Sequence, residues 1–226
     1  MSERARRVDL IQSLHASTAR DYVGRVTAHD KAECASVARR FDADYWDGER
    51  RFGYGGYRYD GRWRSVAEEL VARYALGPGK SLLDVGCGKG FLLYELLTLV
   101  PELKVCGLDV SAYAIEHAKP EIAGSLLRGD AAELPFPDRS FDCVISLATL
   151  HNLPIAALFA ALGEITRVLR DPAQAYVMVE SYRSEREKMN LLYWQLTCAS
   201  FYAVSDWEWV FERAGYAGDY GFIFFE

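Results

Sequence analysis

The sequence predicts an α/β protein with a doubly wound, Rossmann-like, mostly parallel sheet and a helical, aromatic-rich N-terminal extension. Two observations support this fold class. From Ser81 onward, short apolar segments alternate with longer helical ones. Strands that are apolar on both faces and separated by helices belong in parallel sheets covered on both sides, and right-handed crossovers wind such sheets doubly. We therefore divide the chain into an N-terminal lid, residues 1–75, packed on a core domain, residues 76–226.

The lid region has three predicted parts. Apolar residues recur at helical spacing over 8 to about 41, which predicts helix there. Residues 45–63 contain two tryptophans, four tyrosines, one phenylalanine and five glycines. So many glycines disfavour a helix, and so many aromatic rings are unusual for an inert linker. A helix over about 64–75 follows.

In the core domain we expect strands and helices to alternate. The predicted strands are 81–86, 104–109, 125–128, 141–147, 175–180 and 219–225. The predicted helices are 91–99, 111–118, 154–169, 184–203 and 206–214. Whether the sheet has six or seven strands stays open.

Composition and charge disfavour several classes of protein. No apolar run reaches the roughly 18 to 20 residues of a membrane helix, and no apolar segment of signal-peptide length lies near the start. We therefore expect a cytoplasmic protein. A net charge of −6 disfavours a nucleic-acid partner, because binding to phosphates needs a basic surface. The five cysteines include no C-x-x-C pair, so we expect reduced thiols and no metal site.

A glycine-rich turn, LLDVGCGKG at 82–90, joins the first core strand to the first core helix. Gly86, Gly88 and Gly90 let the backbone approach a ligand where side chains would clash. A nicotinamide-binding G-x-G-x-x-G motif has a small residue at position 91, so Phe91 disfavours a dehydrogenase. The spacing suits S-adenosylmethionine instead, with Asp84 placed to accept from the ammonium group.

Acidic residues follow the next two strands. Asp109 ends the second strand, where a carboxylate can accept from both hydroxyls of a ribose. Asp130 follows the third strand and can accept from an adenine amino group, while the backbone of Ala131 reads the edge of the ring. The glycine turn and these residues together predict a site for an adenosyl cofactor.

Residues 81–181 resemble the class I S-adenosylmethionine-dependent methyltransferases. The resemblance lies in LLDVGCGKG, GLDVS and GDAAELPFPDRSFDCVIS; EITRVLRDPAQAYVMVE resembles their fifth-strand region, although Asp171-Pro172 stands where two glycines are common. It implies S-adenosylmethionine as cofactor and S-adenosylhomocysteine as product. It also implies a set of cofactor contacts: Asp84, Gly86, Gly88, Asp109, Asp130 and Ala131.

The flanking segments resemble a narrower group. YWDGERRFGYGGYRYDGRW and GYAGDYGFIFFE are similar to methyltransferases of bacterial surface-carbohydrate clusters, including those linked to the O-methyl phosphoramidate modification of capsules. This resemblance implies a small, anionic acceptor.

Candidates for the acceptor chemistry follow the fourth and fifth strands, because ligands bind outside the carboxyl ends of the strands. His151 is a candidate general base, with an ordinary pKa near 6.5, and packing or positioning is the alternative. Glu180 can accept a hydrogen bond from an acceptor hydroxyl or pair with a lid arginine. Asn152 can orient the acceptor, but we rather expect it to cap the next helix. Tyr182 is a further candidate for acceptor contact.

The aromatic segment of the lid is a candidate wall for both ligands. Tyr57, with Tyr54 and Tyr59 beside it, can face a sulfonium, because aromatic faces attract cations. Tyr54 and Tyr59 are also candidates for acceptor contact. Arg58 and Arg62 can bind a phosphate or a carboxylate. The alternative is a purely structural aromatic brace.

We therefore expect an enzyme that moves a methyl group from S-adenosylmethionine to an oxygen of a small polar, anionic metabolite or carbohydrate-pathway intermediate. We expect a monomer or homodimer without nucleic-acid or membrane partners. Two alternatives stay open: methylation of nitrogen in a small amine, and a cofactor-binding subunit that is catalytically silent.

Overall fold

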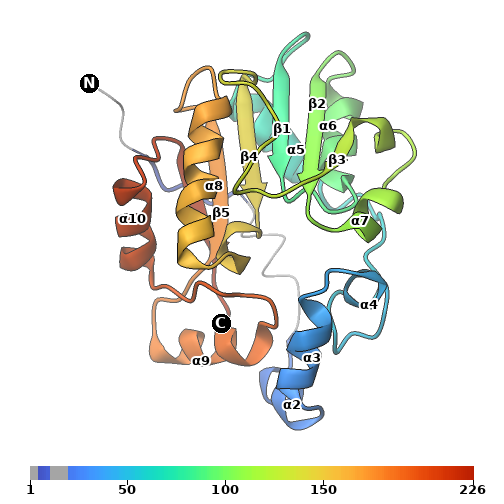
Figure 1. The fold of residues 1–226 in the computed structure, drawn as a ribbon, viewed down its shortest axis with the longest axis vertical. Helices are drawn as coiled ribbons and strands as arrows, with labels where there is room; N and C mark the ends of the chain where they lie inside the picture. The colour runs from blue at the N-terminus through green and yellow to red at the C-terminus, as the bar shows by residue number, and fades with distance from the viewer. Residues whose placement is uncertain (1–4, 11–19) are drawn as a thin grey trace.

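The structure is a computed structural model that describes residues 5–10 and 20–226 (Figure 1). Its helices are α2 (Tyr22–Thr27), α3 (Lys31–Ala38), α4 (Ala43–Trp46), α5 (Arg64–Arg73), α6 (Phe91–Leu99), α7 (Ala112–Glu116), α8 (Ile155–Val168), α9 (Glu185–Trp194) and α10 (Val204–Arg213), with short 3₁₀ turns η1 (Ala123–Ser125) and η2 (Leu150–Asn152). Its strands are β1 (Ser81–Val85), β2 (Lys104–Asp109), β3 (Leu126–Arg128), β4 (Cys143–Leu147), β5 (Ala175–Glu180) and β6 (Asp219–Ile223).

The described strands form one parallel sheet in the order β3-β2-β1-β4-β5-β6. The first strand, β1, lies in the middle of the sheet. β2 and β3 follow on one side of it, and β4, β5 and β6 lie on the other side. The direction of winding therefore changes between β1 and β4, and ligands of doubly wound sheets bind outside the strand ends at that point. The predicted fold class is confirmed, with six strands in the described part of the chain.

Alternate side chains of the central strands pack in two different apolar cores, one on each face of the sheet. Leu83 and Val85 of β1 belong to the cluster that packs against α8 and α10, and Leu82 belongs to the cluster that packs against α5 and α6. Figure 1 shows α8 on one face of the sheet with α5 and α6 behind the other. Burial on both faces explains why these strands are apolar throughout.

The predicted helix over 184–203 is too long. α9 ends at Trp194, and the backbone N–H groups of Ala199 and Ser200 donate to the carbonyl oxygen of His151 at 3.0 and 2.9 Å. Because these donors are bound to the loop after β4, residues 195–203 lie across the end of the sheet rather than in a helix.

The region over 8 to about 41, predicted to be helical, is helical only in part of its described residues. Residues 11–19 lie outside the described residues, and the rest contains two separate helices, α2 and α3. Each begins at an aspartate whose side chain accepts from the backbone N–H three residues later: Asp21 from Gly24 and Asp30 from Glu33. Aspartate at such N-caps starts a new helix and interrupts the previous pattern.

The outer edge of β6 is covered by the start of the described chain. Val8 N donates to Tyr220 O at 2.7 Å, and Tyr220 N donates to Arg6 O at 3.0 Å. A Cβ at position 221 would lie 2.6 Å from Val8 O, so glycine is required there. The edge of β6 is thereby closed by backbone hydrogen bonds, which protects it from pairing with other chains.

Within the described residues, no helix is long and apolar enough to cross a membrane, and the longest, α8, has 14 residues. The five cysteines are all free thiols. The helices α2 to α4 and the helix α9 lie at the same end of the sheet, beyond the ends of the central strands (Figure 1).

Candidate functional site

The glycine turn after β1 is tightly packed. Gly86, Gly88 and Gly90 have φ angles of 86°, 55° and 71°, in the left-handed region that favours glycine. A Cβ on Gly86 would overlap Thr149, and one on Gly88 would lie 2.9 Å from the ring of Trp46. The lid therefore closes directly over the turn through Trp46.

One cavity, which we call the sheet-edge cavity, lies at the ends of the central strands and has a volume of about 220 Å³. Gly86, Asp109, Asp130 and Ala131 all line it. The structure thus brings together four predicted cofactor residues from the ends of β1, β2 and β3. Asp84, Gly88 and Gly90 do not line the cavity and lie behind it.

Two buried carboxyl groups, Asp84 and Asp109, lie in this region. Asp109 is 7% exposed, and its two oxygens accept from Gly88 N and Ser111 N at 2.8 Å each. Burial raises the pKa of Asp109 although these hydrogen bonds oppose the rise. Burial and the nearby Asp109 raise the pKa of Asp84 to about 8. A carboxylate offers about four acceptor positions, so Asp109 retains room for two hydroxyl donors.

A second cavity of about 330 Å³ lies beside the first, and we call it the arginine cavity. Among the described residues its charged lining consists of one carboxylate, Glu180, and five arginines: Arg20, Arg25, Arg50, Arg58 and Arg62. Tyr45, Tyr54, Ala148 and Asn152 line both cavities. These shared residues form the wall between the two cavities.

Glu180 and His151 form a buried pair on the floor of the arginine cavity. The backbone N–H of Glu180 donates to His151 Nδ1 at 3.3 Å, so the ring proton belongs on Nε2. His151 Nε2 lies 3.4 Å from Glu180 Oε2, and Gln195 Nε2 donates to Glu180 Oε1. Burial lowers the pKa of His151 to about 3 and raises that of Glu180 to about 8.

This arrangement does not suit His151 as a general base. Its Nδ1 already accepts a hydrogen bond, its Nε2 carries the proton, and its lowered pKa makes the neutral ring a weak base. Glu180 is better placed, because its Oε2 accepts no hydrogen bond of good geometry from the described residues. The 3.4 Å approach of His151 Nε2 is too long and poorly aligned for a strong hydrogen bond and serves to orient the carboxyl group.

The wall between the cavities contains a strained residue and an unpaired amide oxygen. Ala148 has a φ of 55°, a conformation that costs an L-residue roughly 1–2 kcal/mol. Asn152 does not cap α8, whose N-cap is Pro154 without a side-chain hydrogen bond, so the expected cap is wrong. Its Oδ1 is buried without a partner among the described residues. The wall between the cavities therefore contains a backbone conformation and a buried polar atom that are both locally unfavourable.

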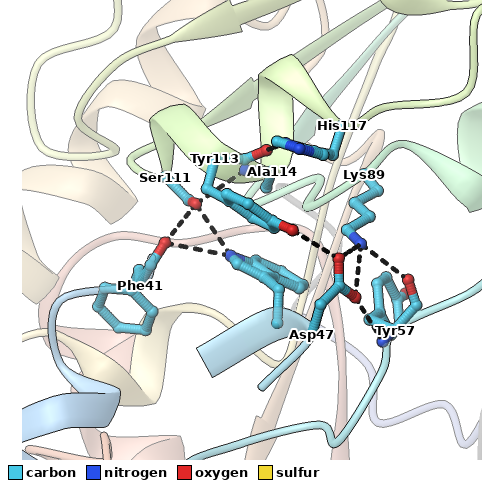
Figure 2. A network of polar contacts seen from close by, with 9 residues as sticks. Phe41, Asp47, Tyr57, Lys89, Ser111, Tyr113, Ala114 and His117 are labelled. Atoms are coloured by element: carbon cyan, nitrogen blue, oxygen red, sulfur yellow. Dashed lines mark hydrogen bonds and ion pairs between the residues drawn. The ribbon is translucent and has the colours of Figure 1, made fainter. Parts of the chain in front are cut away.

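A network of polar contacts fixes the lid to the core (Figure 2). Lys89, in the glycine turn, donates to both carboxylate oxygens of Asp47 at 2.8 and 2.7 Å and to Tyr57 O at 3.0 Å. Tyr113 OH donates to Asp47 Oδ2 at 2.8 Å. The Lys89 side chain is only 6% exposed, so this ion pair holds a buried cation at the lid–core boundary.

A second contact of the same network uses the indole of Trp46. Its Nε1 donates to Ser111 Oγ at 2.9 Å, and Ser111 in turn caps α7 by accepting from Ala114 N (Figure 2). Because Ser111 follows Asp109 by two residues, the lid is fastened directly beside the predicted ribose acceptor.

The structure separates the predicted lid residues into two groups. Tyr57, Arg58 and Arg62 line the arginine cavity, and Tyr54 lines both cavities. Tyr57 does not line the sheet-edge cavity, so its predicted cofactor contact is not supported there. Tyr57 also stacks on Phe91 with ring centroids 4.9 Å apart, as a structural brace does.

Two predicted acceptor residues lie outside both cavities. Tyr59 OH donates to Oε1 of the buried Glu95 of α6 at 2.6 Å. Tyr182 pairs with Ala203 in a single β-bridge. Neither cavity therefore supports the predicted contact of Tyr59 and Tyr182 with the acceptor, which stays a prediction.

Several cavity residues were not singled out from the sequence. Tyr45 and Trp46 come from α4, Arg20 and Arg25 from the start and end of the α2 segment, and Gln195 from just after α9. The surplus of arginines between residues 39 and 64 indicated a basic surface. No local pattern, however, indicated that α2 and α9 meet.

Comparison with known proteins shows similarity to methyltransferases. Residues 82–172 match the profile of a family described as "Methyltransferase domain". A demethylmenaquinone methyltransferase of Symbiobacterium thermophilum is 32% identical over 158 residues, which cover 65% of this chain and 60% of the relative. A fatty-acid O-methyltransferase of Mycolicibacterium smegmatis is 38% identical over 41% of this chain and 34% of the relative.

Among solved structures, a complex between the Haloferax volcanii Trm112 methyltransferase activator and a methyltransferase matches with a TM-score of 0.55 and 28% identity. That match covers 68% of this chain and 67% of the other. The chain spans 60% of the length of the Symbiobacterium relative and 46% of two further demethylmenaquinone methyltransferases. The family profile covers the segment from β1 to the end of α8, which includes the glycine turn.

Proposed function

We propose that this chain, whose residues 82–172 match the "Methyltransferase domain" family, is a class I S-adenosylmethionine-dependent methyltransferase. We propose further that the whole protein transfers a methyl group to an oxygen of a small polar, anionic metabolite. The observation that carries this proposal is the adjacency of two unlike cavities. One is lined by strand-end acids, the other by arginines and Glu180, and they share the wall of Tyr45, Tyr54, Ala148 and Asn152.

The sheet-edge cavity fits the cofactor. Asp109 is buried with acceptor positions left for two ribose hydroxyls, and Asp130 and Ala131 stand on the adenine side. Burial and the charge of Asp109 raise the pKa of Asp84, and burial raises that of Asp109, so a cation nearby would favour both ionised forms. When bound, S-adenosylmethionine supplies an electrophilic methyl group on a sulfonium.

The residues of the arginine cavity supply the rest of the reaction. An acceptor hydroxyl beside Glu180 loses its proton to the carboxylate as its oxygen forms a bond to the methyl carbon, while the carbon–sulfur bond breaks. The products are a methyl ether or ester, S-adenosylhomocysteine and a protonated Glu180. In this proposal His151 and Gln195 are positioning residues that orient the two oxygens of Glu180.

Alignment of the reactants is the larger contribution, because transfer to carbon requires the oxygen in line with the methyl group. Holding two reactants in line contributes up to about 7–11 kcal/mol in the best cases. The aromatic lid, fastened by Asp47 and Lys89, can exclude water from this junction.

The arginine cavity favours an anionic acceptor over an apolar one. The relatives are named for menaquinone precursors and fatty acids, whereas Arg58 and Arg62 add to a basic wall in this chain. An anionic intermediate of a surface-carbohydrate pathway is the acceptor class that we propose. We also propose that the protein works in the cytoplasm as a monomer or homodimer, with residues 1–75 acting as the lid.

The test is single-turnover transfer of labelled methyl from S-adenosylmethionine to paired acceptors: phosphorylated and carboxylated sugars, each beside its uncharged parent and its amino analogue. The proposal expects label on the anionic hydroxyl compounds. Label on the amines alone would establish nitrogen methylation instead. Cofactor binding with no transfer to any acceptor would favour a catalytically silent subunit.

A further inference from the structure

We propose that Arg25 and Arg50, packed on the indole of Trp194, form a subsite for the oxyanion group of the acceptor, a phosphate or a carboxylate. This inference rests on the proposed function and goes further by assigning the anionic part of the acceptor to particular residues. Neither Arg25 nor Arg50 is among the candidates that the sequence indicated.

The two guanidinium groups are held in place by the chain itself. Arg25 donates through Nε to Trp194 O at 3.1 Å and through one terminal nitrogen to Arg50 O at 2.9 Å. Arg50 donates through one terminal nitrogen to Gly53 O. Their Cζ atoms lie 4.9 and 5.2 Å from the centroid of the Trp194 ring. Planar cations stacked on one indole are preorganised, which reduces the entropy lost when a ligand binds.

Among residues 5–10 and 20–226, these two cations have no carboxylate partner. Within the described residues, no ion pair joins Arg25 or Arg50 to an acidic side chain. Burial lowers the pKa of both, and the charge of Arg50 lowers that of Arg25 further. Two neighbouring guanidinium groups remain protonated under any ordinary condition, so their repulsion and partial desolvation call for an anion.

The remaining donors face a ligand-sized space. An arginine has five N–H donors, and the printed contacts use only some of those on each residue, which leaves a fork on both. Both residues line the 330 Å³ cavity, whose only described carboxylate is Glu180. An acceptor can therefore place its oxyanion on the fork and its hydroxyl near Glu180. This charge asymmetry also sets the direction in which the acceptor enters.

Binding of inorganic phosphate and of acetate, followed by isothermal titration calorimetry on the full chain, tests the subsite without any need for turnover. We expect at least one of the two to bind, and glycerol not to bind. The better of the two anions identifies the group as phosphate or carboxylate. Arg50→Gln should weaken that binding about tenfold, as loss of a charged hydrogen bond does. The matched control Arg39→Gln, at an exposed lid arginine outside both cavities, should leave it unchanged.

Arg25→Lys provides a second variant that keeps the charge and removes the fork, and thermal unfolding checks that each variant is folded. The same titrations repeated with S-adenosylhomocysteine should give the same anion affinity. Competition between the two ligands would overturn the proposal, because the arginines would then bind the carboxylate of the cofactor. Anion binding that ignores both substitutions, or no anion binding, would also overturn it. If the protein binds anions but transfers no methyl group to any acceptor, the proposed subsite would be supported and the proposed function would be contradicted.

Discussion

The two cavities are built from different kinds of structure. The sheet-edge cavity consists mainly of residues at the ends of neighbouring parallel strands, such as Asp109, where the fold itself fixes the spacing. The arginine cavity combines the lid, the loop after β4, the end of β5 and the segment after α9. The first cavity depends on the regular sheet, and the second depends on irregular segments that are far apart in the sequence. Changes in the first should therefore affect cofactor binding, and changes in the second should affect the acceptor and the rate.

The largest expected effect comes from Glu180→Gln. If Glu180 is the general base, the turnover rate should fall by about 10²–10⁴-fold, while the affinity for S-adenosylhomocysteine stays the same. The matched control is Glu212→Gln, at an exposed glutamate of α10 far from both cavities. A rate that stays within a few-fold would transfer support to an amine acceptor, which needs no base.

Asp109→Asn should have the next largest effect, on the other cavity. Loss of a charged acceptor for two ribose hydroxyls should weaken cofactor affinity by about 3 kcal/mol, on the order of 100-fold, measured by calorimetry. Because Asp109 also accepts from Gly88 and Ser111, thermal unfolding must confirm that the variant is folded. Unchanged affinity would place the ribose elsewhere.

The pH dependence of the rate should follow Glu180. Burial raises its pKa to about 8, and a base acts only when it is deprotonated. The value of kcat/KM should therefore rise roughly tenfold per pH unit below 8 and level off above it. The lowered pKa of His151, about 3, excludes that ring as the titrating group. A rise centred near 6.5 would contradict this assignment.

Stability should show the opposite dependence on pH. The folded pKa of Glu180 lies above its ordinary value of 4.5, so the protonated group stabilises the fold fully below pH 4.5. That contribution should be lost as the pH rises through about 8. Urea unfolding of the wild type and of Glu180→Gln at several pH values would measure it, and parallel curves for the two proteins would argue against a buried, protonated carboxyl.

The contact between lid and core should have a smaller effect. Asp47→Asn leaves the buried ammonium of Lys89 without its carboxylate, and we expect a loss of about 2 kcal/mol in stability, below the values for fully buried pairs because Asp47 is partly exposed. Cleavage of the lid by protease should become faster. Asp44→Asn, which breaks an exposed ion pair with Arg40 in the same region, is the control and should change neither quantity measurably.

The smallest effect is expected for Tyr59→Phe. The substitution removes a hydrogen bond to the buried Glu95, so about 1 kcal/mol of stability should be lost while kcat and KM stay unchanged. A change in KM would mean that Tyr59 reaches the acceptor in a form of the lid different from the one described here.

These residues also show what the sequence alone could predict. Asp109 follows an apolar strand and precedes a helix cap, and these local patterns place it at the edge of a parallel sheet. Arg25 contacts Trp194, which is 169 residues away in the sequence, and no local sequence pattern predicts that contact. Tyr57 and Tyr59 are two residues apart in an irregular segment, yet one lines a cavity and the other bonds to α6. Sequence periodicity predicts which side of an element a residue faces only where the backbone is a regular helix or strand.

A crystal structure with S-adenosylhomocysteine bound tests the central claim most directly. We expect the ribose against Asp109, the adenine beside Asp130 and Ala131, and the sulfur at the wall of Tyr54 and Asn152, with the forks of Arg25 and Arg50 left for another ligand. A homocysteine carboxylate seated on Arg25 and Arg50, or an adenosine outside the sheet-edge cavity, would contradict the division of the site into two cavities.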